Sequence, residues 1–263
     1  MRSEERGEDQ GEVCGVRDVE TVDELRRYGL RIIQPCDGYR FSLDPLLLCD
    51  FAAIRDGDEV VDLGAGCGII PLILARVTQG SRLVGVESQA AMAELAERNV
   101  ALNGMNERVQ IRHADILEVK KLFPASSFDL VVANPPYRKK GTGRISPKPG
   151  RDLARHESTA SLGDFLAAAK NLVKLTGRIC FIYHPSRLAE FLTEVGAMKL
   201  SPVRLRLVHG NSAAEARMFL IELVKGRKCD LSVLPPLFVY DDHGEYTQES
   251  KMIFGENTGT VIH

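Results

Sequence analysis

The residues of this chain that could do chemistry lie in short segments that follow apolar runs. The first segment reads Asp62-Leu63-Gly64-Ala65-Gly66-Cys67-Gly68, with a glycine at every second position from Gly64. Glycines at this spacing let the backbone turn sharply and approach a ligand closely, and the helix expected next offers unpaired N–H groups at its start. The following apolar run ends at Glu87, where a carboxylate can accept hydrogen bonds from both hydroxyls of a ribose. This arrangement predicts a loop that binds a nucleoside-containing cofactor.

The charge beside the glycines distinguishes two kinds of cofactor. Nicotinamide-dependent enzymes also combine a glycine loop with a later acid, but with the spacing GxGxxG, whereas this chain has GxGxG. Asp62 would repel a pyrophosphate and would suit the cationic amino and sulfonium groups of S-adenosylmethionine. We therefore expect S-adenosylmethionine as the cofactor, bound by Asp62, Gly64, Ala65, Gly66, Gly68 and Glu87.

Asp115 and Ile116 follow a third apolar run and have two possible roles. An acid at this place can contact the adenine amino group of the cofactor, and Ile116 can pack on the adenine ring. Alternatively, Asp115 only caps the helix that follows. We expect both residues to belong to the cofactor site.

The segment Asn134-Pro135-Pro136-Tyr137 follows the apolar run 128–133. Two adjacent prolines cannot continue a β-ladder, so the chain must leave the sheet there as a stiff loop. Because ligands of open α/β sheets bind beyond the carboxyl ends of the strands, this loop should point at the cofactor site. We expect Asn134 to contact the cofactor as well as the substrate.

The residue types in this loop suit methylation of an amino nitrogen on a base. That nitrogen is a poor nucleophile because its lone pair is delocalised into the ring. Hydrogen bonds from its N–H groups to the Asn134 side-chain oxygen and the Pro135 carbonyl would move it toward tetrahedral geometry and aim the lone pair at the methyl donor. Tyr137 would stack on the base, which must be swung out of any helix first. We therefore predict that residues 134–137 are catalytic.

A basic segment follows the catalytic one. Between residues 138 and 155 the chain has three glycines, two prolines, a single acid and seven basic residues, which are Arg138, Lys139, Lys140, Arg144, Lys148, Arg151 and Arg155. The glycines and prolines predict a long loop. A solvated run of charges is one interpretation; we expect instead that these side chains hold phosphates of an RNA around the target base.

Apolar runs and amphipathic segments alternate along the chain from residue 58. Seven strands are expected, at 59–63, 82–86, 109–113, 128–133, 179–183, 198–208 and 216–224, after a strand or turn at 30–34. Helices are expected at 44–54, 69–77, 90–102, 162–175 and 185–195. This alternation predicts an α/β fold with a seven-stranded, mostly parallel sheet, in which the last two strands form a C-terminal antiparallel hairpin.

Composition narrows the class of protein further. The formal net charge of −2 excludes a uniformly basic nucleic-acid coat, so any basic surface must be local. Six cysteines without a CxxC pair predict free thiols rather than a zinc site or a disulfide framework. No apolar run approaches the length of a membrane span, and the polar start lacks a signal peptide. We expect a cytoplasmic protein without bound metal, with a flexible segment at 1–24, one domain at 25–263 and a C-terminal tail from about residue 227.

These motifs resemble the amino-methyltransferases that carry Asn-Pro-Pro-Tyr on a Rossmann-like methyltransferase fold. Within that group the chain is similar to the bacterial tRNA(Val) (adenine-N6)-methyltransferase family from Leu30 onward. The resemblance rests on segments 38–44, 61–70, 134–137, 154–157, 235–237 and 240–247. It implies methylation of adenine N6 beside the anticodon of a tRNA, with S-adenosylmethionine as donor. It also implies that Tyr39 and Phe41 close over the donor.

Other methyl acceptors make the same geometric demand. They include adenine N6 or guanine N2 of ribosomal RNA, and the glutamine amide of a release factor, whose enzymes generally carry a sizeable helical N-terminal domain. DNA methylation usually needs a separate recognition domain. A non-catalytic RNA-binding module that keeps a donor pocket is a further alternative, which the intact Asn134 and glycine loop disfavour.

Overall fold

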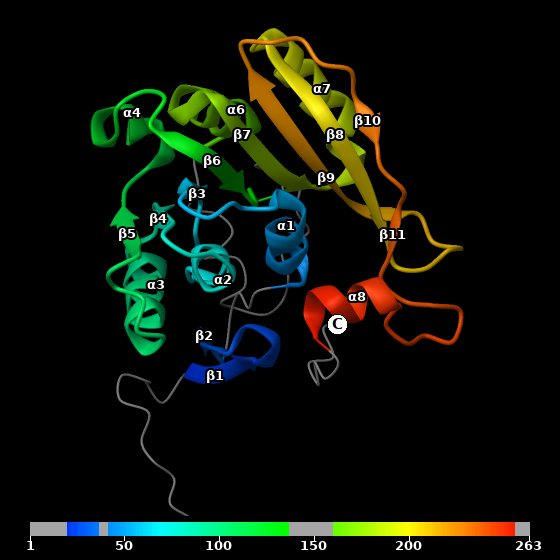
Figure 1. The fold of residues 1–263 in the computed structure, drawn as a ribbon, viewed down its shortest axis with the longest axis horizontal. Coiled ribbons are helices and arrows are strands. Elements are labelled where there is room, and N and C mark those ends of the chain that lie inside the picture. Colours follow the sequence, from blue (N-terminus) through cyan, green and yellow to red (C-terminus); the bar gives the residue numbers. More distant parts are fainter. Residues whose placement is uncertain (1–19, 37–41, 137–159, 256–263) are drawn as a thin grey trace, which may run out of the picture.

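The computed structural model of the chain describes residues 20–36, 42–136 and 160–255. Its centre is a nine-stranded sheet with β11 paired outside the main strand order β10-β8-β9-β7-β6-β3-β4-β5 (Figure 1). The long strands are β3 (Glu59–Leu63), β4 (Arg82–Glu87), β5 (Val109–His113), β6 (Phe128–Ala133), β7 (Val173–Tyr183), β8 (Leu200–His209) and β9 (Ala216–Lys225). Strands β5, β4, β3, β6 and β7 run parallel, and β9 runs antiparallel to both β7 and β8. The predicted mostly parallel sheet with its antiparallel hairpin is therefore confirmed, but two short edge strands, β10 and β11, raise the number of strands from the predicted seven to nine.

The sheet separates two hydrophobic cores because its strands alternate their side chains between the two faces. In β3, for example, Val60 belongs to the first core and Val61 to the second. The first core includes buried residues of α1 (Asp44–Ala52), α2 (Ile69–Val77) and α3 (Ala90–Leu102). The second includes residues of α4 (Val119–Leu122), α6 (Leu162–Leu172) and α7 (Leu188–Ala197), on the opposite side of the sheet (Figure 1). Three short 3₁₀ helices, η1 (Arg26–Tyr28), η2 (Ile116–Glu118) and η3 (Pro185–Arg187), connect elements within the described residues.

The predicted flexible segment at 1–24 is too long at its C-terminal end. Residues 20–24 belong to strand β1 (Glu20–Leu25), which pairs antiparallel with β2 (Leu30–Pro35) in a separate two-stranded sheet. Most β1 side chains are only half-buried, so the strand lacks the apolar pattern by which strands are usually found in a sequence. An ion pair between Glu20 and Arg98 of α3 ties it to the domain. The remaining residues, 1–19, lie outside the described part.

The predicted helix 162–175 is too long as well. Helix α6 ends at Leu172, and Val173 already pairs with Phe128 of β6. Gly177 lies inside β7, next to a register irregularity between Phe128 and Leu130 of the partner strand. A Cβ at position 177 would lie 2.8 Å from the Asp129 carbonyl oxygen, so this glycine permits a close approach of two strands.

The tail from about residue 227 packs along the outer edge of the sheet. Strands β10 (Ser232–Val233) and β11 (Leu237–Phe238) both pair parallel with β8. Helix α8 (Gln248–Phe254) then buries Ile253 and Phe254 in the first core. The Tyr28 hydroxyl donates a 3.0 Å hydrogen bond to the Ile253 carbonyl, so the N-terminal hairpin and the C-terminal helix meet.

Candidate active site

The sequence-predicted loops meet where β3, β4, β5 and β6 end, at a border we call the carboxyl edge. Leu63, the last residue of β3, pairs with Val86 of β4 on one side and with Ala133 of β6 on the other. Gly64, Glu87 and Asn134 directly follow these paired residues. The register of the sheet thus brings together three segments that are far apart in the sequence.

The glycine loop is fastened to β4 and adopts a backbone that other residues resist. The backbone N–H groups of Gly64 and Ala65 donate to the Val86 carbonyl at 2.8 and 3.0 Å. Gly64 and Gly66 have φ values of 82° and 54°, in the left-handed region that glycine enters without a Cβ penalty. A Cβ added to Gly66 would meet only the tip of Met92, at 4.0 Å, so the loop leaves open space above it.

Gly85 of β4 is a contributor that our sequence analysis missed. A Cβ at this position would lie 2.8 Å from the Ala65 Cβ and 2.9 Å from the Ile111 side chain. A residue larger than glycine would therefore push the glycine loop away from the sheet. Its position in an apolar strand is the one signal in the sequence, because a glycine inside a strand often marks such an approach.

Glu87 supports the loop as well as facing the site. Its side chain is 5% exposed. One carboxylate oxygen accepts a 2.8 Å hydrogen bond from the Gly66 N–H, and the other accepts one of 2.9 Å from the Gln89 N–H. Each carboxylate oxygen can accept more than one hydrogen bond, so both can also take a hydroxyl of a ribose.

Asp62 is the unusual charge of the carboxyl edge. It is 1% exposed, and within the described residues neither carboxylate oxygen has a hydrogen-bond partner. Burial raises the pKa of Asp62 well above its usual value, and the charge of Glu87 raises it further. Without a cation nearby, the ionised form of Asp62 is therefore destabilised. A bound cation next to this carboxylate would stabilise the ionised form. This property fits the ammonium group of S-adenosylmethionine.

Asp115 and Ile116 have structural roles in the described chain. Asp115 lies at the N-terminus of η2, where its carboxylate accepts a 2.9 Å hydrogen bond from the Leu117 N–H. Asp115 thus caps η2, and its contact with the adenine of the cofactor, which its half-exposed side chain permits, stays a prediction. Ile116 is buried in the second core, and its packing on a cofactor ring also stays a prediction.

Asn134, Pro135 and Pro136 leave the sheet as expected, without helix or strand structure. Asn134 is half-buried, Pro135 is buried and Pro136 is exposed. The predicted base-stacking residue, Tyr137, lies outside the described residues. The same holds for Tyr39, Phe41 and the whole basic segment, so their roles remain predictions.

Asn99 of α3 links the glycine loop to the N-terminal hairpin, and our sequence analysis missed it. Its fully buried side chain accepts a 2.7 Å hydrogen bond from the Ile33 N–H. It also donates to the Ile33 carbonyl at 3.1 Å and to the Cys67 carbonyl at 2.9 Å. A signal was available, because Asn99 falls on the apolar face of α3, one turn after Leu95 and Ala96.

Asn103, which directly follows the last residue of α3, makes a similar pair of hydrogen bonds to β2. It accepts a 2.9 Å hydrogen bond from the Arg31 N–H and donates to the Arg31 carbonyl at 2.7 Å. Both asparagines thus bind β2, and the Cys67 contact distinguishes Asn99. The pair offers a matched comparison of a loop contact with a hairpin contact.

Comparisons with known proteins identify the family. Residues 44–147 match the family model described as the methyltransferase small domain. The chain is 31% identical over 193 residues to the tRNA1(Val) (adenine(37)-N6)-methyltransferase of Aeromonas hydrophila, covering 73% of this chain and 79% of that protein. It is 30% identical over 215 residues to the protein of the same name from Histophilus somni, covering 81% and 88%. The chain belongs to the tRNA1(Val) (adenine(37)-N6)-methyltransferase family.

Another tRNA1(Val) (adenine(37)-N6)-methyltransferase, from Porphyromonas gingivalis, is 32% identical over 164 residues. That alignment covers 62% of this chain and 64% of the relative. The predicted family is therefore confirmed.

Solved structures agree on the fold. A predicted O-methyltransferase from Agrobacterium tumefaciens superposes with a TM-score of 0.66 at 21% identity, covering 80% of this chain and 94% of that one. Geranyl diphosphate C-methyltransferase from Streptomyces coelicolor, crystallised with S-adenosyl-L-homocysteine, gives 0.52 at 16% identity, with 69% and 79% covered. These superpositions confirm the predicted Rossmann-like methyltransferase fold.

The described part of the chain also bears on membrane and metal binding. None of its helices has both the length and the apolar character that a membrane crossing requires. Among the same residues, no group of three or more His, Cys, Asp or Glu side chains is arranged to hold a metal ion.

Proposed function

We propose that this protein transfers a methyl group from S-adenosylmethionine to N6 of an adenine in tRNA, adjacent to the anticodon. Relatives in its family are named for adenine 37 of tRNA1(Val). The observation that carries the proposal is the pairing of Leu63 with Ala133. This pairing makes Gly64 and Asn134 neighbours, so a donor over the glycines and a base at Asn134 would be within reach of each other.

The donor would be held by the glycine loop and the acids beside it. Asp62 would face the ammonium group, which would supply the positive charge that its buried oxygens lack. Glu87 would accept hydrogen bonds from the ribose hydroxyls, and Asp115 and Ile116 would face the adenine. When bound, S-adenosylmethionine supplies an electrophilic methyl group on a sulfonium.

The target amino group would be held by Asn134 and Pro135. The Asn134 side-chain oxygen and the Pro135 carbonyl would accept hydrogen bonds from the two N–H groups of adenine N6. These contacts would hold the nitrogen pyramidal with its lone pair toward the donor. The methylated nitrogen becomes acidic only after transfer, so no side chain has to remove a proton beforehand. Tyr137 would stack on the base.

The RNA around the base would be gripped by the basic residues between 138 and 155. Because tRNA is a cytoplasmic substrate, the proposal includes a cytoplasmic location. The same site geometry would also accept an amino group of ribosomal RNA or a glutamine amide, so the acceptor has to be tested directly.

Labelled methyl transfer tests the acceptor. We expect incorporation into a tRNA1(Val) transcript, identified as N6-methyladenosine by nucleoside mass spectrometry, and none when adenine 37 is replaced by guanine. Ribosomal RNA and a release factor serve as competing substrates. Incorporation into either of these but not into tRNA would reject the proposed substrate.

A further inference from the structure

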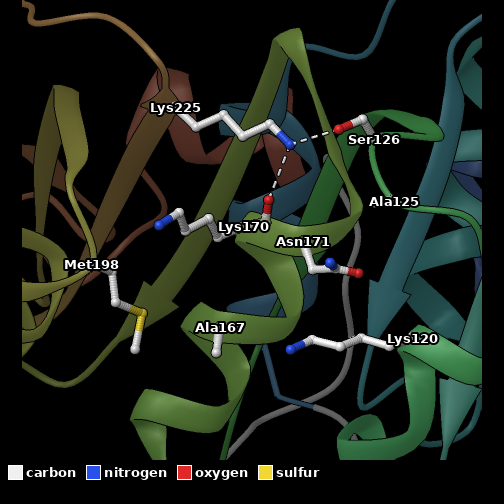
Figure 2. Close-up of a pocket in the computed structure, with 8 residues that line it drawn as sticks. All are labelled: Lys120, Ala125, Ser126, Ala167, Lys170, Asn171, Met198 and Lys225. Carbon is white, nitrogen blue, oxygen red and sulfur yellow. Dashed lines mark hydrogen bonds between the residues drawn. The ribbon is translucent and has the colours of Figure 1, made fainter.

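A basic pocket lies at the opposite border of the sheet, which we call the amino edge. Its volume is about 460 Å³, and it is formed where the start of β6, the end of β9 and the end of α6 come together (Figure 2). Six side chains define its chemistry: Lys120, Ser126, Lys170, Asn171, Met198 and Lys225. A volume of this size suits a small ligand or a single group of a large one.

The charged side chains that line this pocket are all positive. Three lysines line it, and the lining residues of the described chain include no Asp or Glu. Two of the lysines come from helices, Lys120 from α4 and Lys170 from α6, and Lys225 ends strand β9. Burial lowers the pKa of Lys225, and the neighbouring charge of Lys170 lowers it further. The three ammonium groups repel one another, and an anion in the pocket would relieve that repulsion.

Hydrogen-bond donors point to the same kind of ligand. Lys225 Nζ donates to the Ser126 hydroxyl at 2.9 Å and to the Lys170 carbonyl at 3.1 Å (Figure 2). An ammonium group has three N–H donors, so Lys225 keeps one. The Ser126 hydroxyl accepts from Lys225, which leaves its own O–H to donate.

Asn171 adds a polar atom that lacks a partner. Its side-chain oxygen is buried and accepts no hydrogen bond from any described residue. A buried acceptor without a donor costs about 1–3 kcal/mol. This oxygen can accept a hydrogen bond from a ligand hydroxyl. A ribose phosphate has both features, because it carries phosphate oxygens and a 2′-hydroxyl donor.

We propose that this pocket binds a phosphate of the RNA backbone, as a second RNA contact remote from the catalytic loop. The inference rests on the proposed function, because it assumes an RNA substrate. Ser126 of the pocket lies just before β6, and Asn134 lies just after it. At the rise per residue of a β-strand, the pocket is therefore roughly 25 Å from Asn134. A nucleotide held at the carboxyl edge leaves the rest of a folded RNA to run over the neighbouring surface. A phosphate bound at the amino edge would fix the direction in which it runs.

The test compares neighbouring lysines on one helix. Lys120 lines the pocket, whereas Lys121 pairs with Glu118 at 2.7 Å and does not line it. We would measure tRNA binding by the full-length variants K120A, K170A and K121A over a range of salt concentrations. Loss of one phosphate contact lowers the slope of log Kobs against log salt by about one. We expect that change for K120A and K170A, and the wild-type slope for K121A.

A second measurement distinguishes RNA from free phosphate. Inorganic pyrophosphate is titrated calorimetrically into the wild type, K120A and K170A, with the melting temperature of each variant as the control for folding. Binding in the wild type that weakens at least several-fold in both variants supports a phosphate site. Wild-type salt slopes in K120A and K170A would overturn the assignment to RNA. If pyrophosphate binding is then still weakened in the variants, the pocket takes free phosphate; if it is unchanged, the pocket is not a phosphate site.

The methyl-transfer assay keeps this result separate from the proposed function. A wild-type protein that binds tRNA with a pocket-dependent salt slope but transfers no methyl group would reject the activity and retain the pocket. Normal methyl transfer to tRNA, together with a salt slope that neither K120A nor K170A changes, would retain the activity and reject the RNA contact at the pocket.

Discussion

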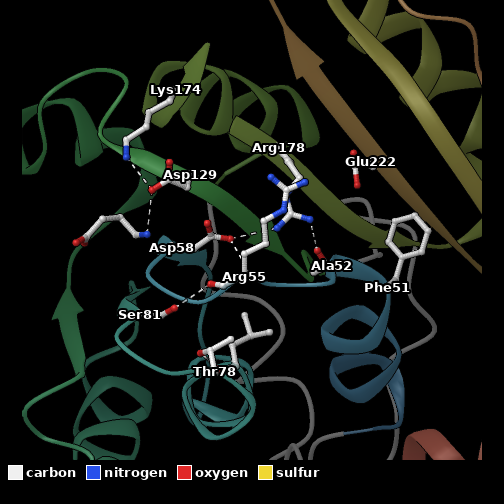
Figure 3. A network of polar contacts seen from close by, with 12 residues as sticks. Phe51, Ala52, Arg55, Asp58, Thr78, Ser81, Asp129, Lys174, Arg178 and Glu222 are labelled. Carbon is white, nitrogen blue, oxygen red and sulfur yellow. Dashed lines mark hydrogen bonds and ion pairs between the residues drawn. The ribbon is translucent and has the colours of Figure 1, made fainter. Parts of the chain in front are cut away.

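At the amino edge of the sheet, Asp129 of β6 is surrounded by donors: it accepts hydrogen bonds from Lys174 at 2.7 Å and from the Glu59 N–H at 3.1 Å (Figure 3). At the carboxyl edge, Asp62 of the neighbouring strand has no hydrogen-bond partner among the described residues. Burial by itself would raise the pKa of Asp129, but these hydrogen bonds and the charge of Lys174 lower it below its usual value. The pKa of Asp62 is raised instead. Asp129 therefore has hydrogen-bond partners within the described residues, whereas Asp62 has none there.

The same contrast extends to the neighbouring charges. Arg178 donates to the Ala52 carbonyl at 2.8 Å and to the Asp58 carboxylate at 3.2 Å (Figure 3). These contacts join α1 and β7 across the start of β3, where they stabilise the sheet. At the carboxyl edge, the Glu87 carboxylate accepts hydrogen bonds from the backbone N–H groups of Gly66 and Gln89. The comparison indicates that the charges of Asp129 and Arg178 stabilise the fold through partners within the described chain, whereas a ligand role for Asp62 and Glu87 stays a prediction.

The largest effect is expected for Asn134→Ala at the carboxyl edge. Removal of a hydrogen bond that forms in the transition state typically lowers kcat by about 10²–10³-fold. We expect a loss of that size in methyl transfer to tRNA, with the melting temperature close to wild type and a much smaller change in the affinity for S-adenosylmethionine. A fully active variant would contradict the catalytic role of Asn134.

Asp62→Asn should separate stability from donor binding. A hydrogen bond to a charged group contributes about 1.5–3 kcal/mol, so the affinity for S-adenosylmethionine should fall by about ten- to a hundredfold. Without donor, the variant should be more stable than the wild type at neutral pH. The reason is that a raised native pKa lowers the free energy of unfolding as pH rises above the unfolded value of about 4.

Thermal unfolding from pH 4 to pH 8, with and without donor, checks both statements for Asp62→Asn. The difference between variant and wild type should shrink toward acid pH, where the carboxyl is protonated in both states. A variant that is less stable than the wild type at neutral pH would show that Asp62 has a structural partner.

Asn99→Ala should destabilise the glycine loop, which Asn99 contacts through the Cys67 carbonyl, and Asn103→Ala should leave that loop unchanged. Loss of Asn99 leaves the Ile33 N–H and the carbonyls of Ile33 and Cys67 without their buried partner, which should lower stability by about 1–3 kcal/mol. Both variants weaken the attachment of β2, so their difference isolates the Cys67 contact. We expect a weaker affinity for S-adenosylmethionine in Asn99→Ala alone, measured by calorimetry. Equal affinities would limit Asn99 to holding the hairpin.

The smallest effect is expected for Asp129→Asn at the amino edge. The ion pair with Lys174 is partly exposed, so its loss should cost about 1 kcal/mol or less, and methyl transfer should be unchanged. The native pKa of Asp129 is depressed, so its contribution is present above pH 4 and disappears as pH falls through the native pKa. Denaturant unfolding at pH 7 and pH 3 tests this pH dependence. A change in the rate of methyl transfer in Asp129→Asn would show that Asp129 has a role beyond stability.

Strong hydrophobic patterns made much of this fold predictable. The bounds expected for β3, α2, α3, β5 and β6 agree with the structure, because each of these elements buries an apolar face. Strand β1 was missed because most of its side chains are polar and only half-buried, so it has no apolar pattern. Its backbone pairing with β2 holds it in place. The start of β7 was assigned to a helix because Val173 continues the apolar pattern of α6, and the pairing with Phe128 that makes it a strand is not local in sequence.

The candidate site shows the same limit. Gly64, Glu87 and Asn134 were found because each follows an apolar strand, and the fold then brings those ends together. That Asp62 would lack partners, and that Asn99 would reach Cys67, depends on side chains from separate elements. Such contacts cannot be read from spacing along one segment.

The hydrogen bond between Tyr28 and Ile253 has a consequence for how the chain is made. It joins residues that are 225 positions apart, so α8 leaves the ribosome long after the N-terminal hairpin against which it packs. The hairpin in turn holds the glycine loop through Asn99. Synthesis from N- to C-terminus thus leaves the support of the glycine loop unfinished until α8 docks, and a nascent or shortened chain would carry residues 134–136 without this support.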